Sequence, residues 1–100
     1  MKVKFHPAFR TDFSEATRYY RKHAGERLAE DFVREVTQTI QDIKCNPEQF
    51  PIVGDGIRSA RLRRFHAYAV RYDFDESTES VYFGSLLHGA RNPDVGKDRF

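Results

Sequence analysis

Two amphipathic helical patterns, separated by a single glycine, constrain the fold of this 100-residue chain more than any other feature. Gly25 is expected to end the first helix, because glycine tolerates the left-handed conformation found at helix ends. Pro47 limits the second helix to Cys45 or Asn46, because a residue before proline disfavours the helical conformation. Apolar residues at helical spacing mark one face of each helix: Phe9, Phe13, Ala16 and Tyr20 in the first, and Leu28, Phe32, Val36, Ile40 and Ile43 in the second. The pattern predicts a helical hairpin whose apolar faces need a sheet to cover.

Segments on both sides of the hairpin have the alternation of β-strands. Residues 2–6 alternate polar and apolar side chains. After a loop rich in proline and glycine, strands are predicted at 57–65, 67–74 and 80–88, with a turn at 75–80. The sequence therefore predicts one α+β domain over residues 1–100. In it, an N-terminal strand and three C-terminal strands form a mainly antiparallel sheet, and a two-helix hairpin packs on one face.

Composition excludes several classes of protein. Cys45 is the single cysteine, so no internal disulfide or CxxC metal site is expected. No stretch approaches the roughly 20 apolar residues that span a bilayer, and the first residues lack the apolar segment of a secretory signal. The four histidines show no metal-ligand spacing. We expect a cytoplasmic protein without a metal or cofactor.

Charge is small in total, at +2, but uneven along the chain. Residues 73–79 hold four acids and no base. Immediately before them, residues 57–72 hold no acid and five arginines: Arg58, Arg61, Arg63, Arg64 and Arg71. Arginine offers a planar fork of donors that suits phosphate or carboxylate. Strand alternation places Arg61 and Arg63 opposite Leu62, and Arg71 opposite Val70, so these three are predicted to share the sheet face away from the helices. The open alternatives are an anion-binding strip and an ordinary solvated face.

The order and spacing of several fragments resemble the RelE/ParE superfamily of toxins from bacterial toxin–antitoxin modules, and the ParE-like branch in particular. The fragments are HPAF, ATRYY, IQDIKCNPEQFP, RRFHAYAVRY and LLHGARNP, which together extend over nearly the whole chain. Two departures stand out. The family commonly shows Phe-Pro-Tyr where this chain has the run from Phe65 to Tyr68, and Gly96 stands where a tryptophan is frequent.

The resemblance implies a cognate antitoxin encoded beside the chain and a target that differs between branches. ParE-like members are associated with poisoning DNA gyrase, whereas RelE-like members cut messenger RNA on the ribosome. The first hypothesis is therefore a ParE-like inhibitor of gyrase that acts by protein binding rather than as an enzyme. Its expected contacts with target or antitoxin are Arg58, Arg61, Arg63, Arg64, Arg71, Tyr19 and Arg91.

The alternative is a metal-independent endoribonuclease of the RelE type. In it, His88, Arg71 and Arg61 would carry out proton transfer and stabilise the phosphate. A histidine that ends a strand is more often structural than catalytic, so His88 remains the minor interpretation. A third possibility is a silent member that binds only its antitoxin. The near-neutral net charge favours gyrase over the ribosome, because a strongly basic surface helps a protein to bind RNA phosphates.

Overall fold

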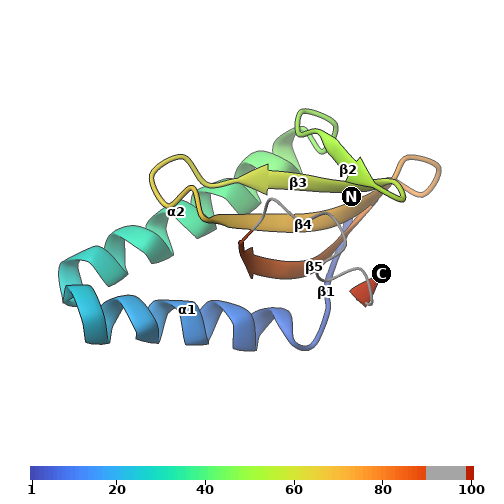
Figure 1. Cartoon of the computed structure of the whole chain (residues 1–100). Coiled ribbons are helices and arrows are strands. Elements are labelled where there is room, and N and C mark those ends of the chain that lie inside the picture. The colour runs from blue at the N-terminus through green and yellow to red at the C-terminus, as the bar shows by residue number, and fades with distance from the viewer. Residues whose placement is uncertain (90–98) are drawn as a thin grey trace.

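A helical hairpin and a five-stranded sheet make up the computed structural model, which describes residues 1–89 and 99–100 (Figure 1). The helices are α1 (Phe9–Ala24) and α2 (Glu26–Cys45). The strands are β1 (Lys2–Phe5), β2 (Ile52–Gly54), β3 (Ile57–Arg61), β4 (Tyr68–Asp75) and β5 (Ser80–His88). In the part of the chain described, no helix is long and apolar enough to cross a membrane.

The strands are arranged in the order β1-β5-β4-β3-β2. β1 runs parallel to β5, and all other neighbours are antiparallel. This is the predicted α+β architecture. One strand, β2, was not predicted, because its three residues lie in a loop rich in proline and glycine. It pairs with β3 through a tight turn in which Asp55 and Gly56 both have positive φ.

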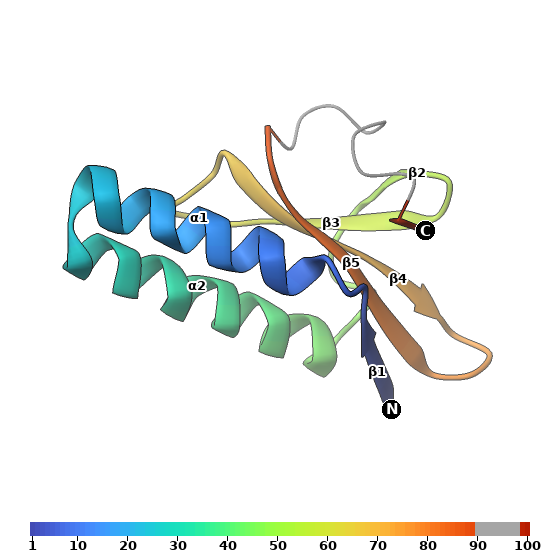
Figure 2. The same cartoon turned by 90° about the horizontal axis from the view of Figure 1, so that it is seen from below.

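The two helices lie side by side on one face of the sheet (Figure 2). Gly25 has φ 96°, a backbone conformation that a side chain would strain, and it separates α1 from α2 without a longer loop. At the far end of α2, the Asn46 N–H donates to the Asp42 carbonyl, just before Pro47. The predicted C-terminal ends of both helices are confirmed.

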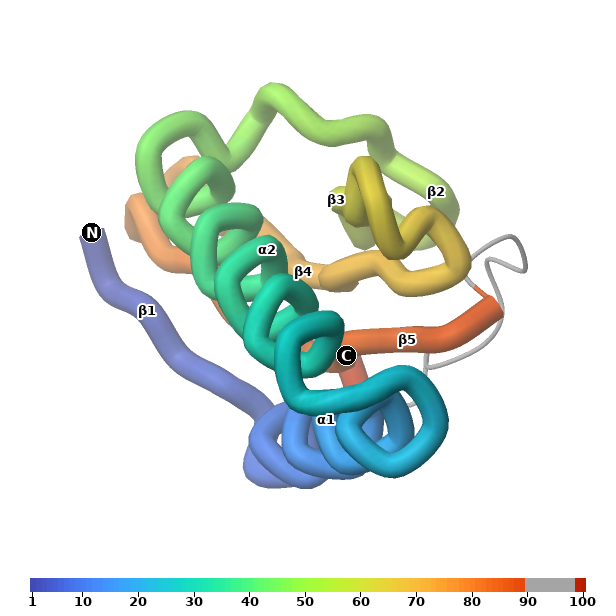
Figure 3. Tube along the Cα trace, turned by 90° about the vertical axis from the view of Figure 1, so that its left-hand side faces the viewer, coloured from blue at the N-terminus to red at the C-terminus, as the bar shows by residue number. Residues whose placement is uncertain are grey.

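The core lies between the hairpin and the sheet, which curves around α2 (Figure 3). Phe32 and Val36 of α2 are fully buried, as are Val70 and Tyr72 of β4 and Phe83 of β5. Burial of a side chain of this size stabilises the fold by roughly 1.5–3 kcal/mol. Phe32 lies edge-on to Phe65 and Tyr68, at ring-centroid distances of 5.1 and 5.2 Å. The apolar faces predicted for the helices are therefore the faces that the sheet covers.

A β-bulge at Gly84 changes which face the residues of β5 present. Arg71 pairs with Ser85 while Tyr72 pairs with Phe83, so Gly84 has no partner across the ladder. Simple alternation predicts that His88 shares a face with Tyr82. The structure instead aligns His88 with Phe83 on the helix side, because the bulge adds one residue to the strand.

The last two residues of the chain, Arg99 and Phe100, contact strand β5 of the sheet. The Phe100 ring lies edge-on to the Tyr82 ring, at 6.0 Å between centroids. Tyr82 alternates with the core residues Val81 and Phe83, so its side chain lies on the face opposite the helices. Part of this face, which the sequence predicts to be open, is therefore covered by the chain itself.

Candidate functional site

The outer surface of the helical hairpin carries a groove made of two adjoining cavities that share Arg21 and Val33. Their volumes are about 270 and about 560 Å³. The first is lined by Arg10, Phe13, Ser14, Thr17, Arg18, Arg21 and Val33, and the second by Arg21, Glu30, Val33, Arg34, Thr37 and Gln38. Four arginines and one acid thus surround a floor that includes Phe13 and Val33. We call this surface the hairpin groove.

Charge in the hairpin groove is partly compensated. Arg21 pairs with Glu26 at 2.7 Å, and Arg34 pairs with Asp31 at 3.1 Å. Arg10 and Arg18 have no ion pair within residues 1–89 and 99–100. The groove therefore presents positive charge beside exposed apolar surface, a combination that suits an acidic, amphipathic partner.

The five predicted strip arginines do not gather on one face. Arg58 donates from Nη1 to the carbonyls of Glu48 and Phe50, at 3.1 and 2.7 Å, and so fixes the loop between α2 and β2. Arg64 pairs with Asp31 at 2.8 Å and lies over the Phe65 ring, so it fastens the β3–β4 connection to α2. These two arginines have structural contacts that the sequence pattern does not reveal.

Arg71 is the clearest departure from the predicted strip. Its position on the face opposite the helices is as expected, but only 2% of it is exposed. Burial lowers the pKa of its guanidinium. A buried guanidinium is not available to a bound phosphate, so Arg71 does not form the exposed anion site that alternation alone predicts.

Arg61 and Arg63 are exposed and line a cleft of about 190 Å³ beside α2. The rest of its lining is Glu35, Gln38, Thr39, Asp42, Gln49 and Phe50. Oε1 of Glu35 accepts a hydrogen bond from the backbone N–H of Arg64. Oε2 of Glu35 is buried and has no hydrogen-bond partner in the described chain. Of the five strip arginines, these two remain available to a partner.

His88 lies on the helix side of the sheet, in a cleft between α1 and the ends of β4 and β5. Its ring is edge-on to Tyr68 at 5.0 Å, and Tyr19 lines the same cleft. Burial, with a smaller effect of the neighbouring Tyr20 and Tyr19, raises the pKa of the Tyr68 hydroxyl. His88 and the buried Arg71 are thus on opposite faces of the sheet. The structure does not assemble His88, Arg71 and Arg61 into the predicted ribonuclease site.

Tyr19 is 56% exposed, whereas Tyr20 packs against Phe32 in the core. This is the division expected where two adjacent tyrosines occupy an amphipathic helix. Arg91 and Gly96, the remaining predicted residues of interest, lie outside the residues that the structure describes. Within the described ranges, no three His, Cys, Asp or Glu side chains are grouped so that they could hold a metal ion.

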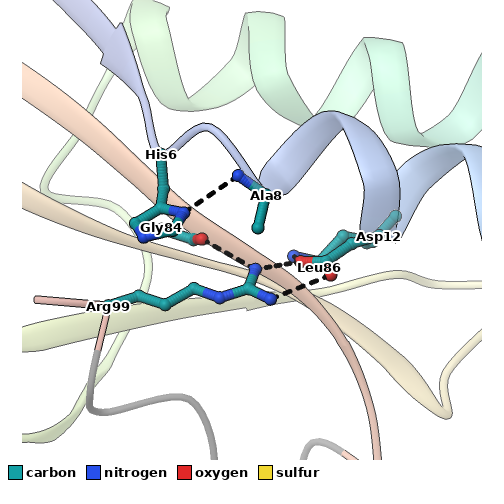
Figure 4. Close-up of polar contacts among 6 residues, drawn as sticks. All are labelled: His6, Ala8, Asp12, Gly84, Leu86 and Arg99. Atoms are coloured by element: carbon teal, nitrogen blue, oxygen red, sulfur yellow. Dashed lines mark hydrogen bonds and ion pairs between the residues drawn. The ribbon is translucent and has the colours of Figure 1, made fainter.

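An ionic contact at the end of the chain was not predicted from the sequence (Figure 4). The Arg99 guanidinium makes two hydrogen bonds to the Asp12 carboxylate and a third, at 3.2 Å, to the Gly84 carbonyl. Asp12 also accepts from the Leu86 N–H at 3.2 Å. Nearby, His6 Nδ1 accepts from the Ala8 N–H at 3.0 Å, next to the start of α1. Residues at positions 12 and 99 are too far apart in sequence for spacing to signal this contact.

The described residues form a small α+β domain whose surface carries a basic groove and two polar clefts. The family model described as "ParE toxin of type II toxin-antitoxin system, parDE" matches residues 3–93. A solved structure titled "Chromosomal ParDE TA system from P. aeruginosa" aligns with a TM-score of 0.74 and 14% sequence identity. The alignment covers 88% of this chain and 95% of that one. No match was found among curated proteins. The chain belongs to the ParE toxin family of type II toxin–antitoxin systems.

Proposed function

We propose that this toxin inhibits DNA gyrase by protein binding and that a cognate antitoxin neutralises it. The separation of His88 from Arg71 is the observation that favours protein binding over RNA cleavage. Cleavage needs an acid–base group and a phosphate-stabilising cation around one reacting centre. Here the histidine lies on the helix side of the sheet, and the arginine is buried on the other face.

The hairpin groove is the surface we assign to the antitoxin. Arg10 and Arg18 have no carboxylate partner within the described chain, and the apolar side chains of Phe13 and Val33 line the same groove. An acidic, amphipathic segment would pair its carboxylates with the arginines and bury its apolar face on this floor.

Reversing charge in the groove tests this assignment. The double variant Arg10→Glu/Arg18→Glu should bind the antitoxin at least about tenfold more weakly, because two attractions become repulsions. Arg27→Glu is the matched control, since Arg27 is an exposed arginine of α2 that lines neither groove cavity. Unchanged antitoxin affinity in the double variant would place the antitoxin elsewhere on the toxin.

Arg61 and Arg63 are the residues we assign to the gyrase contact. They are exposed and line a cleft that adjoins the hairpin groove at Gln38, while neither of them lines the groove itself. The variant Arg61→Glu/Arg63→Glu should lose gyrase inhibition while it keeps its affinity for the antitoxin. Loss of both properties together would mean that one surface serves both partners.

RNA cleavage is tested in parallel. Messenger RNA on translating ribosomes should remain intact at toxin concentrations that inhibit gyrase. Specific cuts that disappear in His88→Ala and in Arg61→Ala would instead establish the ribonuclease alternative.

A further inference from the structure

The cleft that contains His88 has the composition of a site for a cationic side chain. It lies between α1 and the ends of β4 and β5 and has a volume of about 240 Å³. Its lining is Asp12, Glu15, Ala16, Tyr19, Tyr68, Leu86 and His88. The lining thus combines three aromatic rings with two carboxylates, and it includes neither lysine nor arginine.

The walls of the cleft are held in place by the core. Tyr68 and His88 are directly paired across β4 and β5, and their rings meet at an interplanar angle of 72°. Tyr68 is 8% exposed and is supported from behind by Phe32, at 5.2 Å between centroids. On the opposite wall Tyr19 lies against His23, at 4.5 Å between centroids. Because the core fixes Tyr68, this ring can receive a cation without an ordering cost.

The two carboxylates of the cleft differ in their partners. Asp12 is occupied, because the guanidinium of Arg99, which is not part of the cleft lining, is bound to it (Figure 4). Glu15 follows three residues later on the same helix face, and it has no ion pair or hydrogen bond within residues 1–89 and 99–100. One carboxylate of this helix face thus already binds a guanidinium, and Glu15 is a second carboxylate on the same face.

We propose that this cleft binds an arginine side chain of a protein partner, with its guanidinium against the tyrosine and histidine rings and its N–H groups donating to Glu15. Aromatic faces attract cations, and arginine also stacks on them through its planar fork. The carboxylates disfavour phosphate or any other anion. The flat walls and the carboxylate favour arginine over lysine, whose compact ammonium is more strongly hydrated.

This site is distinct from both surfaces assigned above. The hairpin groove is basic and the Arg61–Arg63 cleft has both acids and arginines in its lining, whereas this cleft has carboxylates and no arginine or lysine and so suits a basic side chain. The inference rests on the lining of the cleft and does not depend on gyrase being the target.

The test uses the full chain labelled for NMR, with Nα-acetylarginine amide as the probe. Saturable shifts are expected for the rings of Tyr19, Tyr68 and His88. Nα-acetylcitrulline amide, which has nearly the same shape without the charge, should bind at least about fivefold more weakly.

Substitution of Glu15 distinguishes specific binding in the cleft from general electrostatic attraction to surface acids. Glu15→Gln removes one exposed charge and should leave the fold intact. It should lower the affinity for the arginine probe about fivefold or more. Glu76→Gln is the control, because Glu76 is also an exposed acid and lies in the β4–β5 turn, away from the cleft lining. Equal affinity for the citrulline probe would overturn the proposal. Unchanged affinity in Glu15→Gln, or shifts that fall outside the cleft, would do so as well.

Discussion

Phe100 lies against Gly84, in the space that a side chain at position 84 would occupy. A β-carbon built on Gly84 would overlap three carbons of the Phe100 ring. The backbone of Gly84 does not have the positive φ that marks Gly25 or Gly56, so the requirement for glycine comes from the ring above it. The bulge in β5 and the end of the chain therefore form one structural unit.

Gly84→Ala should lower the free energy of unfolding by about 1–3 kcal/mol, because the added methyl group displaces the ring. The measurement is chemical denaturation of the single variants and the double variant with Phe100→Ala. In the Phe100→Ala background the cost of Gly84→Ala should largely disappear, since the ring is no longer there to be displaced. A cost that is the same in both backgrounds would assign the glycine to backbone conformation instead.

Asp12→Asn should destabilise the protein by about 1–2 kcal/mol, since it removes the charge that binds Arg99 in a partly buried position. The side chains of Asp12 and Arg99 are 19% and 22% exposed. Asparagine can still accept the hydrogen bond from the Leu86 N–H, so the loss of stability measures the contribution of the ion pair. Glu26→Gln is the control. It breaks the pair between Glu26 and Arg21, which are 59% and 50% exposed, and should cost less than about 0.5 kcal/mol. Equal costs for the two variants, measured by urea denaturation, would contradict a special role for Arg99.

Acid should weaken the attachment of the β3–β4 connection to α2. The hydrogen bond from Arg64 is the main cause that lowers the pKa of the Asp31 carboxyl below its ordinary value of 3.8. A lowered pKa in the folded state contributes stability above pH 3.8, and this contribution is lost as the pH falls through the folded-state pKa. The stability difference between wild type and Asp31→Asn should therefore be constant near pH 7 and shrink below about pH 4. A difference that is independent of pH would rule out the ionised pair as its cause.

High pH should destabilise the fold through ionisation of the Tyr72 hydroxyl. Burial raises the pKa of this hydroxyl to about 12, against a small opposing effect of Arg58, and the hydroxyl donates to the Pro47 carbonyl at 2.5 Å. A raised folded-state pKa means that stability is full below pH 10 and falls as the pH rises from 10 toward 12. Tyr72→Phe should cost about 1 kcal/mol at pH 7 and lose less stability over this alkaline range. Ultraviolet titration should show tyrosine ionisation near pH 12 that is lost in Tyr72→Phe.

Sequence patterns predicted the fold well where a local rule decides the structure. The limits of α1 and α2 follow from Gly25 and Pro47, and the ends of β5 follow from its run of apolar residues. No sequence pattern predicts the short strand β2, because a three-residue segment does not signal its pairing with β3.

The site was harder to predict, because burial and partners are properties of the whole structure. Alternation placed Arg71 on the correct face, yet nothing local indicates that this face is partly covered. The bulge at Gly84 breaks the alternation on which the position of His88 was inferred. Arg58 and Arg64 form contacts with distant segments, as does Arg99 with Asp12, and no spacing rule reveals them.

The most direct test of the proposed function is the rate at which purified DNA gyrase supercoils relaxed plasmid DNA as the toxin concentration rises. The protein-binding account predicts dose-dependent inhibition that a stoichiometric amount of the cognate antitoxin reverses. Full gyrase activity in the presence of excess folded toxin would contradict it.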